Sequence, residues 1–503
     1  MVKRGSLAAL SFTWAACCAL AVAQTAAKPS QDTVMTKEQG QKLLNSVDAV
    51  MAFDSEDTGL AAVPNVKRRL VTRDEVTAYL IKNFKEDESA KRLQRSEIVL
   101  KKFGLLSQDF QLQPFLLKLL TEQVAGYYDE KTKTVNLLNW VPASAQEPVL
   151  AHELTHALQD KRVDLQTWSN DGFKGESKSA PEDNQRIHGD EVETARQAVA
   201  EGQAMLVYVD YAAKHPDQQK AADASAEDSS VMSRAPLMLQ KSLEFPYVSG
   251  MAFEQALRAA GGKDAAFAHA LDAPPTSSFE ILNPQDYLAH TPVPVLRIPD
   301  VHGLLDARWQ PYDVGGMGEL DVDMMASAFS GAAAAASLAP AWDGGLYYAA
   351  QRRSATAAEK QTSASIGVLY YSQWKSAEAA QAFEQIYAAE LPRKDSGVAE
   401  RTKDKAVGEQ IYSTHDGDVL LALSGRRLFI AEGFSVATAR KLRDALAAVQ
   451  TSGPVRIASD SRAPRLPELT LGLAKTMGAR GLLRFALEPG RYTATRNSAS
   501  TTR

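Results

Sequence analysis

The stretch Val149–Leu158 constrains what this chain can fold into more than any other. It contains His-Glu-Leu-Thr-His within an apolar run, a pattern that predicts a buried helix. His152 and His156 are four residues apart, so they project from one helical face and both imidazoles can reach a single metal ion. Glu153 then lies beside that ion, where it can accept a proton from metal-bound water. The whole chain has only 8 histidines in 503 residues, and chance would produce this motif in roughly one such chain in a hundred.

A second helix, predicted over residues 190–211, offers the third metal ligand. Glu201 lies among apolar neighbours in this segment, and buried carboxylates are rare unless they are paired or bound to metal. Zinc in a catalytic site takes three protein ligands and a water molecule. The sequence therefore predicts one Zn²⁺ ion held by His152, His156 and Glu201.

Other residues near the motif compete for roles at this site. Glu193 and His188 are alternative third ligands, although Glu193 lies in a charged turn and His188 falls at the edge of a polar loop. Asp160 and Asp190 could orient the histidines by hydrogen bonds to their second ring nitrogens. Both aspartates could equally be solvent-exposed charges on their helices, with no role at the site.

Three polar-tipped rings further along are candidate donors to the oxyanion that forms during acyl transfer. Tyr247, Tyr287 and His290 could each supply such a hydrogen bond, or each could simply be a packed or surface ring. A hairpin predicted over residues 126–138 precedes the motif helix. Its free edge could pair with an extended peptide substrate, or the hairpin could be purely structural.

The beginning of the chain has the pattern of a signal peptide, predicted over residues 1–23. Lys3 and Arg4 precede an apolar stretch that ends in Ala-Val-Ala. We therefore expect export to the periplasm or secretion, with a lipid anchor or a retained signal anchor as alternatives. Both cysteines, Cys17 and Cys18, lie in this segment. Its removal would leave no disulfide and no cysteine ligand, so any metal must bind histidine and carboxylate.

Composition narrows the class of partner. A hydrophobic content of 45%, a charged content of 23% and a formal charge of -5 are typical of a globular domain protein. Nothing in this charge balance suggests nucleic acid as a partner. After signal cleavage no integral membrane span is expected, and the sequence leaves the oligomeric state open.

Four further regions follow the signal segment. Residues 24–110 are expected to form a helical N-terminal region, either packed on the core or acting as a prosegment, and residues 111–300 the metal-binding domain. Residues 301–450 are expected to form a small α+β module, with strands over 365–371, 410–413, 419–423 and 427–431 and helices over 376–391 and 437–449. Residues 451–503 are expected to be a flexible basic tail.

Three segments together resemble a known family. Gly-Tyr-Tyr-Asp at 126–129, His-Glu-Leu-Thr-His-Ala-Leu-Gln-Asp at 152–160 and Ala-Val-Ala-Glu-Gly-Gln-Ala at 198–204 resemble exported bacterial metallopeptidases of the zincin type, on the gluzincin branch. The resemblance implies an α+β fold, with a mainly helical zincin-like core that carries a hairpin or small sheet, plus the C-terminal module. The chain departs from the family where Met205 stands in place of an aspartate one turn after the glutamate ligand.

The motif and the resemblance together predict an exported zinc metallopeptidase that hydrolyses peptide bonds in a protein or peptide substrate. Glu153 would act as the general base on zinc-activated water. The alternative is an exported zinc-binding scaffold, or a degenerate peptidase that acts as a binding protein. A purely structural site normally closes with four protein ligands and has no use for an adjacent base, so Glu153 favours the enzyme.

Overall fold

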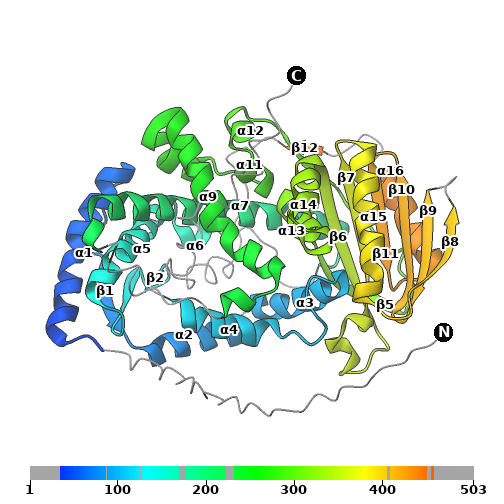
Figure 1. Cartoon of the computed structure of the whole chain (residues 1–503), viewed down its shortest axis with the longest axis horizontal. Coiled ribbons are helices and arrows are strands. Elements are labelled where there is room, and N and C mark those ends of the chain that lie inside the picture. The colour runs from blue at the N-terminus through cyan, green and yellow to red at the C-terminus, as the bar shows by residue number, and fades with distance from the viewer. Residues whose placement is uncertain are drawn as a thin grey trace, which may run out of the picture.

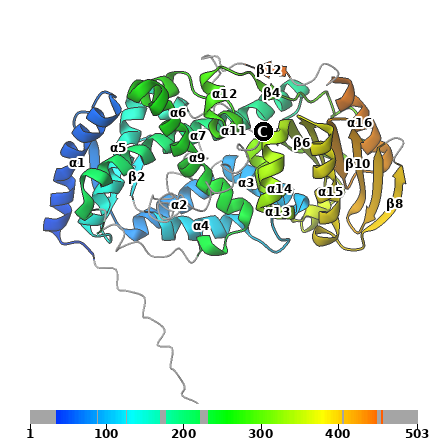
Figure 2. The same cartoon turned by 45° about the horizontal axis from the view of Figure 1, so that its top comes forward.

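The described part of the chain combines a helical body with a separate large sheet, and is of the α+β class. The computed structural model describes residues 34–86, 88–124, 126–168, 177–218, 220, 231–404, 408–449 and 455–457. The predicted signal segment and nearly all of the predicted tail lie outside these residues. The motif helix belongs to the helical body at one end of the long axis, and the large sheet occupies the other end (Figures 1 and 2).

The N-terminal region is mainly helical, as predicted. It contains α1 Lys37–Thr58, β1 Lys67–Val71, α2 Arg73–Glu86 and α3 Glu88–Phe103, and α4 Leu112–Gln123 follows at the start of the predicted metal-binding domain. A capping box opens α2: the Thr72 amide donates to Glu75 Oε2 at 2.8 Å, and the Glu75 amide donates to Thr72 Oγ1 at 3.2 Å. These bonds satisfy amides that a helix start leaves without partners.

The predicted hairpin forms from β2 Gly126–Asp129 and β3 Thr134–Leu138, which pair antiparallel. The sequence did not indicate that β1 joins it, parallel to β3, to make a sheet of order β1-β3-β2. Among the described residues β2 is thus an edge strand, and its outer side faces the motif helix.

The motif lies on α5, Ala143–Val163, which is followed by α6 Leu165–Trp168, α7 Ala180–Lys214 and α9 Leu237–Lys263. Every residue from Pro148 to Asp160 is buried, which confirms the predicted buried helix. The helix that carries Glu201 starts at Ala180, ten residues before the predicted start at residue 190. Pro181 and two acidic residues in the first turn of α7 are typical of a helix start, although the polar composition of this segment resembles that of a loop.

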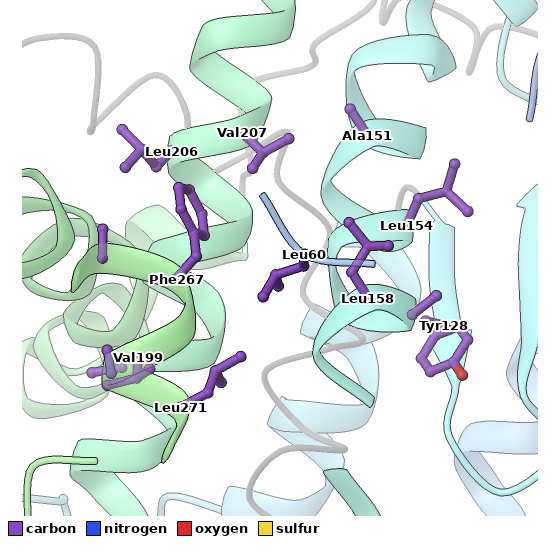
Figure 3. Packing of buried hydrophobic residues seen from close by; sticks show 14 of the residues in the cluster. Leu60, Tyr128, Ala151, Leu154, Leu158, Val199, Leu206, Val207, Phe267 and Leu271 are labelled. Atoms are coloured by element: carbon purple, nitrogen blue, oxygen red, sulfur yellow. The ribbon is translucent and has the colours of Figure 1, made fainter. Parts of the chain in front are cut away.

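Apolar side chains fix α5 against α7. Ala151, Leu154 and Leu158 of α5 and Val199 and Val207 of α7 belong to one buried cluster, which Figure 3 shows. Phe267 and Leu271, from the segment after α9, complete that cluster in the same view. Packing on this face leaves the histidine face of α5 turned toward Glu201.

Two glycines let α7 and α9 cross at van der Waals distance beside the metal-ligand position. A Cβ atom at Gly250 would lie 2.1 Å from the carbonyl oxygen of Ala198, and one at Gly202 would lie 2.2 Å from the carbonyl carbon of Gly250. In both cases the added Cβ atom would overlap backbone atoms, so a side-chain rotation could not remove the clash.

We expect Gly250→Ala to lower the free energy of unfolding by about 1–3 kcal/mol or more, because α9 must move away from α7. The measurement is the midpoint of denaturant unfolding. Gly303→Ala is the matched control, since nothing lies within 4 Å of a Cβ atom there. Equal stability of the two variants would contradict the close crossing.

The segment between the helical body and the sheet contains short elements. These are η2 Asp264–His269, α10 Ala270–Asp272, α11 Ser278–Leu282, α12 Pro284–Leu288, and β4 Val293–Val295, which pairs with β12 Val455–Ile457; a further short turn, η1 Met232–Arg234, precedes α9.

The large sheet has seven antiparallel strands in the order β5-β6-β7-β11-β10-β9-β8. Its strands are β5 Trp309–Gly316, β6 Trp342–Arg352, β7 Ile366–Trp374, β8 Ala399–Asp404, β9 Glu409–Thr414, β10 Gly417–Ser424 and β11 Arg427–Glu432. The helices around it are α13 Glu319–Ser330, α14 Ala332–Leu338, α15 Ala377–Lys394 and α16 Val436–Val449, with the short turns η3 Ala339–Ala341, η4 Glu359–Gln361 and η5 Ser363–Ser365.

Strand residues alternate between the two faces of this sheet. Tyr370 and Ile430 belong to the same core as α15, whereas Leu369 and Phe429 belong to the core of α16. The helices therefore cover opposite faces (Figure 1). The four predicted strands and both predicted helices are present, but β5, β6 and β8 were not predicted, so the module is larger than expected.

None of the helices in the described part of the chain has both the length and the apolar character needed to cross a membrane.

Candidate metal centre

The structure brings His152, His156 and Glu201 together from two helices. The Nε2 atoms of the histidines are 3.3 Å apart. Glu201 Oε2 lies 3.2 Å from His152 Nε2 and 3.5 Å from His156 Nε2. All three side chains are buried, and they form the one group of this kind among the described residues. The predicted third ligand therefore lies where a metal site needs it.

The three separations match the geometry of a tetrahedral ion. Ligand atoms at ~2.05 Å from zinc and at tetrahedral angles are ~3.3 Å from one another, and the observed separations are 3.2, 3.3 and 3.5 Å. The two Nε2 atoms and Glu201 Oε2 could thus take three of the four positions around such an ion. The donor set of two imidazoles and one carboxylate suits a divalent ion such as zinc.

Glu201 is a buried anion held by its surroundings. Its side chain has 0% exposure, and neither carboxylate oxygen accepts a hydrogen bond of good geometry within the described part of the chain. Burial by itself would raise the pKa of Glu201, but the two histidines beside its carboxylate lower it well below the usual value. A carboxylate that stays ionised without ordinary donors is suited to a cation.

Glu153 lies on the same helix and is held by the hairpin. Its Oε2 atom accepts a hydrogen bond from the Tyr128 amide at 2.8 Å, and the residue is 2% exposed. That amide belongs to β2, so the edge strand fixes the direction of the carboxylate. Glu153 directly follows His152 on α5, and its charge acts on Tyr247 together with that of Glu201, so the carboxylate lies near the triad.

Tyr247 is the candidate oxyanion donor that the fold brings to the triad. Its ring on α9 stacks on the His152 ring, with centroids 6.3 Å apart and planes at 18°. Burial raises the pKa of Tyr247 well above its usual value, and the nearby charges of Glu201 and Glu153 raise it further. Its phenol therefore stays protonated and able to donate.

The other two candidate donors lie elsewhere. The Tyr287 hydroxyl donates to the Ala273 carbonyl at 2.7 Å, and His290 is an exposed residue with a φ of 52°. Within the described ranges, no hydrogen bond, ion pair or ring contact joins either of them to the triad. Neither residue therefore lies where it could donate a hydrogen bond to an oxyanion at the triad.

The alternative third ligands are separated from the triad along α7. Glu193 lies eight residues and His188 thirteen residues before Glu201, which correspond to about 12 and about 20 Å of helix rise. His188 faces a small cavity that it shares with Glu191 and Ser277. Of the three candidates, only Glu201 joins the histidines.

The aspartates considered as orienting groups contact other partners. Asp160 accepts hydrogen bonds from the Tyr128 hydroxyl at 2.6 Å and from Lys133 Nζ at 2.7 Å. Asp190 is paired with Arg92. The side chain that does contact one of the three residues was not predicted: Gln159 Oε1 lies 2.8 Å from His156 Nδ1. The signal was available: Gln159 follows His156 by three residues, on the same face of a buried helix.

No protein-family model, curated protein or solved structure matches this chain. Function is therefore inferred from the geometry of the triad and its surroundings.

Proposed function

We propose that this protein is an exported zinc-dependent metallopeptidase with a zincin-like core, acting on peptide bonds of protein or peptide substrates. The observation that carries the proposal is the convergence of two imidazoles and a carboxylate at separations of 3.2–3.5 Å, beside a carboxylate that is not a ligand. Three protein ligands leave one coordination position for water or substrate, as in catalytic zinc sites. Export is proposed from the pattern of the first residues of the sequence.

When bound, the metal supplies Lewis-acid polarisation of a carbonyl and acidifies a coordinated water. Two side chains of the protein account for proton transfer and for stabilisation of the developing charge. Glu153 takes a proton from the attacking water and passes it to the leaving amine. Tyr247 donates a hydrogen bond to the oxygen that gains negative charge.

The outer side of β2 is the proposed place for substrate. The Tyr128 amide on this side bonds Glu153 at 2.8 Å. An extended peptide that pairs with this edge would therefore lie beside the general base and would exchange with its carboxylate at that amide.

The test is cleavage of an unfolded protein by the purified chain. We expect hydrolysis to be lost after treatment with a chelator and restored by about one equivalent of zinc, because the three ligands hold a single ion. Metal content is measured in parallel. Zinc bound at one equivalent without hydrolysis of proteins or peptides would favour the scaffold or degenerate-enzyme alternative, and absence of bound metal would reject both.

A further inference from the structure

Two buried glutamines form a hydrogen-bonded relay behind one of the ligands. Gln159 of α5 and Gln203 of α7 each have 0% exposure. Gln159 Oε1 lies 2.8 Å from His156 Nδ1, and Gln159 Nε2 donates to the Ala200 carbonyl at 3.0 Å and to Gln203 Oε1 at 2.9 Å. The relay therefore joins the back of the imidazole to α7.

The relay ends on backbone carbonyls beyond α9. Gln203 Nε2 donates to the carbonyl oxygens of Ala266 at 2.7 Å and Phe267 at 3.2 Å. Both residues lie in the π-helical turn Asp264–His269, which follows a break in α9 at Gly261 and Gly262. Gly262 has a φ of 69°, a conformation that favours glycine.

The backbone carbonyls at the end of the relay determine which atom donates in each of its hydrogen bonds. A carbonyl oxygen only accepts, so the amide nitrogen of Gln203 must face Ala266 and its oxygen must face Gln159. Gln159 meets two acceptors, the Ala200 carbonyl and Gln203 Oε1, so its own nitrogen faces them. Its oxygen is left for His156, which must then donate from Nδ1.

We infer that Gln159 and Gln203 are positioning residues that hold His156 as the Nδ1–H tautomer, with the Nε2 lone pair directed at the metal position. The π-helical turn sets the direction of the relay through its carbonyls. The inference rests on the proposed metal centre and extends it. No such relay serves the other histidine, because His152 Nδ1 has no hydrogen-bond partner in the part of the chain that the structure describes.

The first test compares two buried glutamines of one helix. Gln159→Leu removes the relay, and we expect zinc affinity to fall about 10–100-fold, measured by competition with a chromophoric chelator. Gln146→Leu is the matched control: Gln146 is also fully buried on α5, but it bonds to Leu138 and Val141. We expect it to lower stability and leave zinc affinity unchanged. An equal loss of affinity in both variants would overturn the positioning role.

A second test uses non-additivity. Of the side-chain hydrogen bonds that the described structure gives Gln203, the one to Gln159 leads to a metal ligand. Gln203→Leu should weaken zinc binding less than Gln159→Leu does, because Gln159 keeps its bond to Ala200. The double variant should bind zinc as Gln159→Leu alone does. Losses that add would show that the two glutamines act independently and would contradict the relay.

A third measurement separates this inference from the proposed function. Nitrogen-15 spectra of the metal-free chain should show the proton of neutral His156 on Nδ1 in wild type, and a mixture of tautomers in Gln159→Leu. A wild type that binds no zinc but keeps the Nδ1–H tautomer would reject the metallopeptidase and retain the relay. An Nε2–H tautomer in the wild type would reject the relay whether or not zinc binds.

Discussion

Glu153→Gln is expected to keep its metal and lose hydrolysis. General acid–base catalysis contributes about 10²–10⁴-fold, so kcat should fall by that factor while zinc content stays near one equivalent. The glutamine oxygen can still accept the Tyr128 amide that now bonds Glu153 at 2.8 Å, which preserves the position of the side chain. What the substitution removes is the group that accepts the proton.

The control for this variant is another glutamate of the same helix. Glu147 lies near the start of α5, within 3.5 Å of the Tyr211 hydroxyl and bonded to Gln218, and none of the hydrogen bonds it makes in the described part of the chain involves the triad. Glu147→Gln should retain wild-type hydrolysis and wild-type zinc content. Peptide cleavage by Glu153→Gln at the wild-type rate would remove the basis for the peptidase assignment.

Much of the site was predictable because its chemistry follows helical periodicity. Histidines four residues apart in an apolar run can only share a face, and a glutamate surrounded by small and apolar residues had to be buried with a partner. The structure places Glu201 against both histidines. The length of chain between His156 and Glu201 did not matter, because packing of α5 on α7 brings the two faces together.

Other features depend on contacts distant in sequence and carried no local signal. The choice among Tyr247, Tyr287 and His290 required the path of α9, whose approach to α7 depends on Gly202 and Gly250. The orientation of His156 depends on carbonyls of a π-helical turn more than a hundred residues away. Two of the missed strands also lacked a local signal. Proline or glycine in β5 and β6 weakens their intrinsic strand propensity, so these strands form because they pair with neighbours in the sheet.

Glu201→Gln is expected to remove the metal. The substitution keeps the shape of the side chain but removes the negative charge that completes the donor set, so zinc affinity should fall by more than the about 10–100-fold typical of losing an orienting hydrogen bond. Hydrolysis should be lost with the metal. Zinc stoichiometry and affinity, measured on the folded protein, decide the outcome, and wild-type affinity in this variant would show that Glu201 is not a ligand.

Glu254 provides the matched control, because it is as fully buried as Glu201 but the pKa of its carboxyl group is shifted in the opposite direction. Glu254 also has 0% exposure and no hydrogen-bond partner within the described ranges, but burial raises its pKa well above the usual value. A carboxyl group whose pKa is raised on folding binds its proton more tightly in the native state, so stability is lost as pH rises from the ordinary pKa toward the raised one. Glu254→Gln should therefore stabilise the chain increasingly over that range and leave zinc binding intact. The histidines lower the pKa of Glu201 instead, and only there should the same change of charge remove a metal ion.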